Sequence, residues 1–231
     1  MSSSMRAGII AVAAVALGLG LAGCGSDTTS EPAAPSEKTS TSAASNPAPP
    51  PASAKATGAN YTIVDYIRDN EIVETPVKRG DPGAPTINLP FPPGWSDAGP
   101  RAPEWAYGAI VSDDAAMAQD PPTVIALVSK LTGNVDPAKV LEFAPGEIQN
   151  LPGYEGAEEG SPSELSGFDA VQIGGTYTKD GVLRAIAQKT VVIPGQDGLF
   201  VLQLNADGRE DQMGALMDAT AVIDEQTTIT P

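Results

Sequence analysis

Three patterns of apolar and polar positions divide the chain. Behind the single positive charge of Arg6, residues 7–22 are an unbroken run of Ala, Val, Ile, Leu and Gly. Residues 25–59 contain no Val, Ile, Leu, Met, Phe, Trp or Tyr. From residue 60 to residue 231, apolar residues recur with the periods of strands and helices. We therefore expect one globular domain over 60–231, long enough to hold a core without disulfides or a metal.

The last third of this domain has the clearest strand pattern. Three segments rich in β-forming residues, "FDAVQIGGTYT", "VLRAIAQKTVVI" and "LFVLQLNA", are separated by "KDG" and "PGQDG". Asp180-Gly181 is typical of a tight hairpin turn. The pattern predicts an antiparallel meander.

Helices are predicted before and after this meander. Thr62 with Asp65 indicates a capped helix that ends near Asn70, and Asp136 followed by Pro137 indicates a second helix, which Pro145 interrupts. After the meander, Asp207 with Glu210 predicts the start of a helix. Its expected apolar face is Met213, Leu216, Met217, Thr220 and Ile223.

Shorter strands are expected in the first half of the domain. "YGAIV" and "PTVIALVSKL" indicate strands, the second apolar on both faces, and "TINLP" indicates an edge strand in a Pro-rich stretch. Strands in a row with helices on either side along the chain predict an α+β fold. We expect a central antiparallel sheet covered by helices on one face.

The N-terminal pattern is typical of secretion. The apolar run is shorter than the ~20 residues that span a bilayer, and with Arg6 before it and small residues after it, it indicates a signal peptide over 1–23. The sequence Leu21-Ala22-Gly23-Cys24 resembles the bacterial lipobox, whose cysteine becomes the lipid-bearing N-terminus. The alternative is an ordinary free or buried cysteine. We expect Cys24 to be the lipid-attachment residue, anchoring the protein to the extracytoplasmic face of the cell membrane, with partial release left open.

Residues 24–59 are Ala, Ser, Thr, Pro and a few charges. Such a composition cannot bury enough apolar area to offset the entropy of ordering, so it predicts a disordered tether, with glycosylation left open.

Charge and residue absences exclude several functions. The formal net charge of −16 argues against nucleic acid as a partner. The chain has no histidine, which excludes a Ser-His-Asp triad and an HExxH zinc site. We expect no enzyme activity, no cofactor and no metal site.

Two catalytic alternatives survive in the sequence. Thr176 and Lys179 have a Ser/Thr–Lys spacing but fall in a hairpin strand. The other alternative is a carboxylate pair within an acidic segment, which also has the oxygen ligands for a weak Ca²⁺ site. Solvated loops explain such a segment better; its acids are Glu155, Glu158, Glu159, Glu164 and Asp169.

Aromatic residues on irregular segments are the candidates for ligand binding. Trp95, Trp105 and Tyr107 flank a segment rich in Pro and Gly, and Phe143 lies on the predicted helical segment 136–151. The alternative is that these rings close one end of the core. The helical segment packed over the sheet is expected to form a wall of an apolar cleft.

Long segments resemble a known family. "YTIVDYIRDNEIVETPVKRGDPGAPTINLP", "DPPTVIALVSKLTGNVDPAKVLEFAPGEIQNLPGY" and "QKTVVIPGQDGLFVLQLNADG" are similar to the LpqN/LpqT family of mycobacterial lipoproteins, as is "DATAVIDEQTTITP". The resemblance implies a PsbP-like α/β/α sandwich, more layered than the pattern alone predicts. It also implies a non-enzymatic envelope lipoprotein linked to virulence, with trehalose mycolates and inner-membrane lipid transporters as partners.

Two functions are therefore expected. In the first, the tethered domain binds glycolipids or acyl chains. The alternative is a protein-interaction adaptor that docks on the domains of a membrane lipid transporter or on a host protein, helped by its acidic surface.

Overall fold

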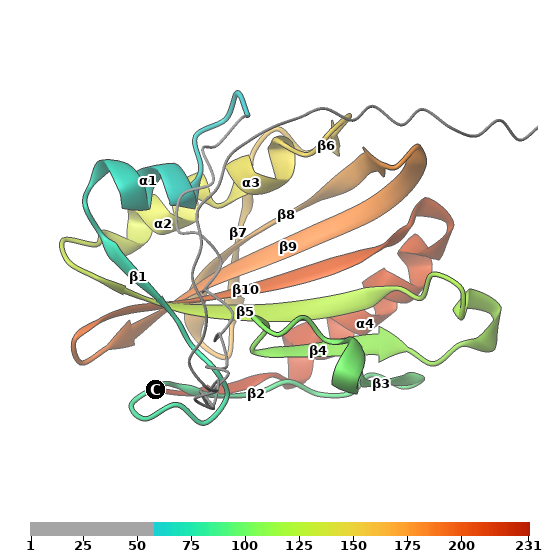
Figure 1. The fold of residues 1–231 in the computed structure, drawn as a ribbon, viewed down its shortest axis with the longest axis horizontal. Helices are drawn as coiled ribbons and strands as arrows, with labels where there is room; N and C mark the ends of the chain where they lie inside the picture. Colours follow the sequence, from blue (N-terminus) through green and yellow to red (C-terminus); the bar gives the residue numbers. More distant parts are fainter. Residues whose placement is uncertain (1–57) are drawn as a thin grey trace, which may run out of the picture. The chain divides into compact units, whose positions relative to one another are not determined.

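The computed structural model describes residues 58–231. The predicted signal peptide (1–23), Cys24 and nearly all of the predicted tether (24–59) lie outside the described residues. In the described part, a large antiparallel sheet with few helices confirms the α+β prediction (Figure 1).

The centre of the sheet is the predicted meander. β8 (Phe168–Lys179), β9 (Val182–Gly195) and β10 (Gly198–Arg209) pair in succession, and β10 pairs on its other side with β5 (Thr123–Thr132). Asp180 and Gly181 both have positive φ, 52° and 78°, as a tight hairpin turn requires. The meander and the buried strand at 123–132 are confirmed.

Shorter strands complete this nine-stranded sheet. They are β1 (Val73–Pro76), β3 (Trp95–Asp97), β4 (Gly108–Ser112), β6 (Glu155–Gly156) and β7 (Ser161–Leu165). The predicted "TINLP" strand is β2 (Thr86–Asn88), which pairs with β11 (Thr228–Thr230) in a separate two-stranded sheet. Three 3₁₀ turns lie at Gly99–Arg101, Ala115–Met117 and Glu210–Gln212.

The first helices begin where their caps predict. In α1 (Ile63–Asp69), the Thr62 Oγ1 accepts from the Asp65 N–H at 3.2 Å, and an Asp65 carboxylate oxygen accepts from the Thr62 N–H at 3.1 Å. The Asp136 carboxylate caps α2 (Pro137–Phe143), and α3 (Pro145–Gln149) follows at once. The capping residues and the interruption at Pro145 are confirmed.

The start of α4 (Met213–Gln226) corrects one prediction. Asp207 lies inside β10, where its carboxylate accepts from the Tyr177 hydroxyl at 2.6 Å and from Arg184, so it does not cap the helix. The chain leaves the sheet after Arg209, whose N–H donates to the Gln212 side-chain oxygen at 2.8 Å. Strand β10 continues two residues beyond the predicted start of the helix, to Arg209, because Asp207 is paired with β9 and its carboxylate binds Tyr177 and Arg184.

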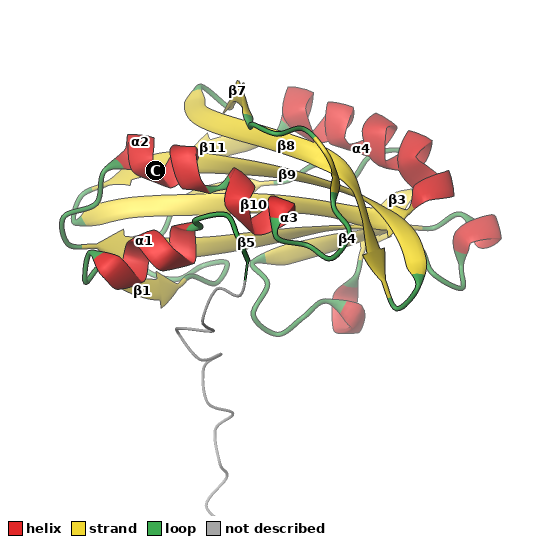
Figure 2. Ribbon diagram, turned by 90° about the horizontal axis from the view of Figure 1, so that it is seen from above, coloured by secondary structure: helices red, strands yellow, loops and turns green. Residues whose placement is uncertain are grey.

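Helices cover both faces of the sheet, so the expectation of one covered face is wrong. Val192 and Val201 pack with α1 and α2, whereas their neighbours Val191 and Leu202 pack in the cluster that includes α4. Figures 1 and 2 show α1, α2 and α3 together on one side and α4 on the other. Strands with apolar side chains on both faces need cover on both. The observed layers agree with the sandwich that the resemblance implies, while the PsbP-like assignment itself stays a prediction.

Candidate functional site

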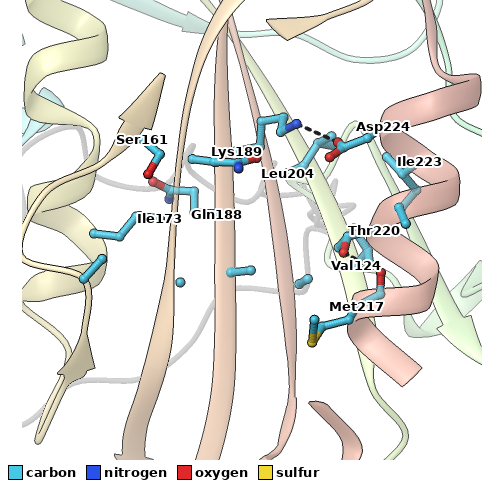
Figure 3. Close-up of a pocket in the computed structure, with 16 residues that line it drawn as sticks. Val124, Ser161, Ile173, Gln188, Lys189, Leu204, Met217, Thr220, Ile223 and Asp224 are labelled. Atoms are coloured by element: carbon cyan, nitrogen blue, oxygen red, sulfur yellow. Dashed lines mark hydrogen bonds and ion pairs between the residues drawn. The ribbon is translucent and has the colours of Figure 1, made fainter. Parts of the chain in front are cut away.

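A groove of about 410 Å³ lies between α4 and the sheet, on the face opposite α1–α3 (Figure 3). Its floor is formed by β8, β9 and β10, through residues such as Gly174, Ala187 and Leu204. Met217 and Thr220 of α4 form the opposite wall. The volume falls within the range of small-molecule sites, roughly 300–1,000 Å³.

The groove exists because the floor residues are small. Alternation along a strand sends successive side chains to opposite faces, and on β8 and β9 the larger residues, Ile173 and Ile186, pack with α3. Gly174, Ala185 and Ala187 occupy the alternate positions, which line the groove and its extension, and Ile173 and Ile186 border these hollows as well. A second hollow of about 260 Å³ shares Gly174, Ala187, Met217 and Thr220 with the first and extends it toward Met213.

α4 is anchored by a narrow stripe that leaves the groove open. Leu216, Ala219 and Ile223 are buried, whereas Met213 and Met217 are 37% and 64% exposed. The predicted apolar face is the one turned to the sheet: Leu216 and Ile223 are buried there, and Met213, Met217 and Thr220 line the groove or its extension. Met217 therefore lines the groove while most of its side chain stays exposed to solvent.

One end of the groove is polar. The Lys189 ammonium of β9 pairs with the Asp224 carboxylate of α4 at 2.7 Å, and their side chains are 9% and 41% exposed (Figure 3). Ser161 and Gln172 line the groove from β7 and β8. The groove thus joins an apolar channel to an ion pair.

A partly buried acid lies on the other face of the sheet. Glu147 of α3 accepts hydrogen bonds from Gln203 at 2.7 Å and from Gln188 at 3.4 Å. Burial raises the pKa of Glu147, and these two hydrogen bonds offset only part of the rise. Glu147 does not line the groove, and its contacts hold α3 against β9 and β10.

A second polar network braces the end of the meander. Arg184 pairs with Asp207 and, at 2.7 Å, with Asp120. Burial and the hydrogen bond to Asp207 raise the pKa of Tyr177 to about 12. Burial lowers the pKa of Arg184, but the hydrogen bonds to Asp207 and Asp120 outweigh it and leave that pKa raised. Near neutral pH Tyr177 therefore stays neutral and Arg184 stays charged, as a structural brace requires.

The four aromatic candidates lie away from the groove. Trp95 and Tyr107 are buried in one apolar cluster, and the Tyr107 hydroxyl accepts from the Ile87 N–H at 3.2 Å. Trp105 is 44% exposed. Phe143 lies on the α1–α3 side, where its ring packs edge-on against Tyr61 at 4.7 Å between centroids. The structure brings Trp95 and Tyr107 together but not the other two, and ligand binding by any of the four stays a prediction.

The acidic segment is spread along strands and loops. Glu155 lies in β6, and Glu164 faces Asp169 across the β7–β8 pair, while Glu158 and Glu159 lie between β6 and β7. Among residues 58–231, no group of three or more Asp, Glu, His or Cys side chains is placed to hold a metal ion. Thr176 and Lys179 both lie in β8, as predicted.

Sequence reasoning missed the groove residues. A signal was present: Gly174 and Gly175 interrupt a strand of β-forming residues, and small residues alternate in "RAIAQK" on the next strand. An isolated Gly in a strand points to close approach of another group, but only the pairing of β8 with β9 places these residues side by side.

The comparisons with known proteins agree with one another. The family described as "Probable lipoprotein LpqN" matches residues 59–230. Lipoprotein LpqN of Mycobacterium tuberculosis (strain ATCC 25618 / H37Rv) is 60% identical over 177 residues, which cover 77% of this chain and 77% of that protein. A crystal structure of LpqN, described as involved in cell envelope biogenesis of Mycobacterium tuberculosis, matches with 61% identity and a TM-score of 0.71. The match covers 75% of this chain and 100% of that one.

The family match spans almost all of the described residues. Within them, α4 is 14 residues long, and no helix has the length and hydrophobicity to cross a bilayer. The family resemblance predicted from the sequence is confirmed, and the chain belongs to the LpqN lipoprotein family.

Proposed function

We propose that this protein is a lipid-anchored envelope protein that binds acyl chains or glycolipids of the trehalose mycolate type without catalysis. In this proposal the protein supports virulence and cell envelope biogenesis, the process in which LpqN of Mycobacterium tuberculosis is described as involved. Cys24 carries the anchor on the extracytoplasmic face of the membrane.

The groove under α4 carries the proposal. Alkyl chains lack directional bonding groups, so they bind along apolar residues, which Gly174, Ala185 and Ala187 provide in the groove and its extension. Each CH₂ group transferred from water contributes about 0.8 kcal/mol. Several methylenes in such a channel are enough for a saturable complex.

Two observations favour binding over catalysis. A lysine acts as a nucleophile or a base only as a free amine, whereas the Lys189 ammonium is paired with the Asp224 carboxylate. The other groove residues are apolar, amide or hydroxyl groups, none of them hydrogen-bonded to a general base within the groove. Such a site holds a ligand and leaves its bonds intact.

Filling the groove tests the proposal. The chain from residue 24 onward, carrying Cys24→Ala, is titrated by calorimetry with decyl maltoside and with decanoate, each below its critical micelle concentration. Ala187→Phe is expected to remove saturable binding, because the ring occupies the channel. Ala138→Phe, an exposed site on α2 across the sheet, is the matched control and is expected to bind as the parent does. Failure of the parent to bind either compound would overturn the proposal.

The anchor is tested in cells. Cys24→Ala is expected to shift the protein from the membrane fraction to the medium or to unprocessed precursor, because two or three acyl chains hold a protein firmly and a chain without them is not held. Circular dichroism of the domain is expected to be unchanged. Retention in the membrane with the parent acyl mass contradicts the assignment of Cys24.

The acidic charge favours a second candidate, an adaptor for basic surfaces on a lipid transporter or a host protein. A formal charge of −16 raises association rates with basic partners, and salt lowers them. Cross-linking in envelopes, compared with the Cys24→Ala strain, tests it. Enrichment of no partner at low salt counts against the adaptor.

A further inference from the structure

The ion pair at the polar end of the groove lies where both of its charges are costly to place. Asp224 lies in the last turn of α4, where the helix dipole disfavours a negative charge. Lys189 points its ammonium from the middle of β9 into a groove with an apolar floor, and its side chain is only 9% exposed. A long charged side chain in such a place costs more to bury than an apolar one.

The groove has a direction. Lys189 and Asp224 are the only charged residues among the 16 that line it, and the second hollow, toward Met213, has none. From Met213 to Asp224, the helix rise of 1.5 Å per residue gives a distance of about 16 Å. The groove therefore has a polar end at Lys189–Asp224 and an apolar end toward Met213.

We propose that the Lys189–Asp224 pair is the head-group recognition element of the groove and that it selects neutral, hydroxyl-bearing heads over anionic ones. This inference rests on the proposed binding of acyl ligands.

The selection follows from charge. Hydroxyl groups donate to the free lone pairs of Asp224 and accept from the free N–H groups of Lys189, so the ion pair stays intact and both ions gain charge-assisted hydrogen bonds. A carboxylate head competes with Asp224 for the same ammonium. It leaves two negative groups beside one positive group, which costs affinity in a partly desolvated site.

Exchanging the charge of the pair tests the inference. In the parent chain (residue 24 onward, Cys24→Ala), decyl maltoside is expected to bind at least about tenfold more tightly than decanoate at neutral pH, the factor that one charge-assisted hydrogen bond supplies. Asp224→Asn frees the Lys189 ammonium, and the preference is expected to shift toward decanoate by about tenfold or more. Lys189→Met keeps the aliphatic stem but is expected to weaken both ligands, decanoate most.

Asp211→Asn is the matched control. Asp211 pairs with Arg209 at 2.8 Å on the surface, so its loss changes the net charge by the same amount without touching the groove. The ratio of the two affinities is expected to stay at the parent value.

Three outcomes separate the inference from the proposed function. A reversed or strongly shifted ratio in Asp224→Asn alone supports the inference. Binding of both probes with an unchanged ratio in Asp224→Asn, or a parent preference for decanoate, overturns the inference and leaves acyl binding in place. Absence of binding to the parent overturns the proposed function and the inference with it.

Discussion

The two faces of the sheet are built from the same strands but are packed differently. On one face, α3 packs on Ile173, Tyr177 and Ile186, and α1 and α2 pack on a second cluster that includes Val192 and Val201. On the other face, α4 is held by Leu216, Ala219 and Ile223 above glycine and alanine, and a groove remains. Neighbouring residues of the same strand face opposite sides of the sheet, so the large residues and the small residues alternate along it.

The difference shows how a strand can specify a core and a cavity together. Residue size on one face of the meander sets the packing there without changing the other face, because successive side chains along a strand point to opposite faces. Both faces contain buried apolar clusters, and the α4 face also has apolar surface left for a ligand beside its cluster.

The largest effect is expected from a cavity made on the α1–α3 face. Ile148 of α3 is 5% exposed and packs with Ile173, Tyr177 and Ile186. Ile148→Ala is expected to lower the free energy of unfolding by about 2–4 kcal/mol, through lost transfer energy and the cavity left behind. Urea unfolding measures the change; a loss as small as that of a surface mutant would show that this face is not tightly packed.

Replacing an alanine by leucine is expected to have different effects on the two faces of the sheet. Ala144→Leu, at the fully buried junction of α2 and α3, is expected to destabilise by about 1–3 kcal/mol through overpacking. Ala187→Leu, over the groove, is expected to change stability by less than about 1 kcal/mol because space is available. Thermal unfolding of both variants measures the contrast, and equal losses contradict it.

A smaller effect is expected from the acid on the α1–α3 face. Burial raises the pKa of Glu147 above its ordinary value of 4.5, so the folded state favours the protonated acid. As pH rises past that value, the unfolded chain releases its proton first and stability falls until the raised pKa is passed. Glu147→Gln, which resembles the protonated acid, is expected to remove this fall and to be the more stable protein at neutral pH. Urea midpoints measured across this pH range test the sign, and a steeper fall in the variant contradicts it.

The smallest effect on stability is expected at the groove wall. Met217 is 64% exposed, so Met217→Ser is expected to change the free energy of unfolding by less than about 0.5 kcal/mol. The affinity of the Met217→Ser variant for decyl maltoside is expected to fall several-fold, because the groove wall loses an apolar side chain. Unfolding and titration of the same sample separate the two effects; loss of stability without loss of affinity assigns Met217 to the core.

Several local elements of the fold and the family could be predicted from the sequence alone. Local chemistry was enough for the caps at Thr62 and Asp136, the hairpin turn at Asp180-Gly181 and the meander, because these signals depend on neighbours a few residues apart. The resemblance of several long segments was enough to predict the family. The lipobox at Cys24 stays a prediction from sequence, outside the described residues.

Tertiary structure decided the rest. Asp207 resembles a helix cap in sequence, but its partners Tyr177 and Arg184 lie 30 and 23 residues away. The second covered face, the exposure of Met217 and the pairing of Lys189 with Asp224 depend on how strands and α4 come together. A groove forms between segments that are distant in the sequence. The sequence of one strand gives the size of each residue and the residues that share its face, but it does not show what packs against that face.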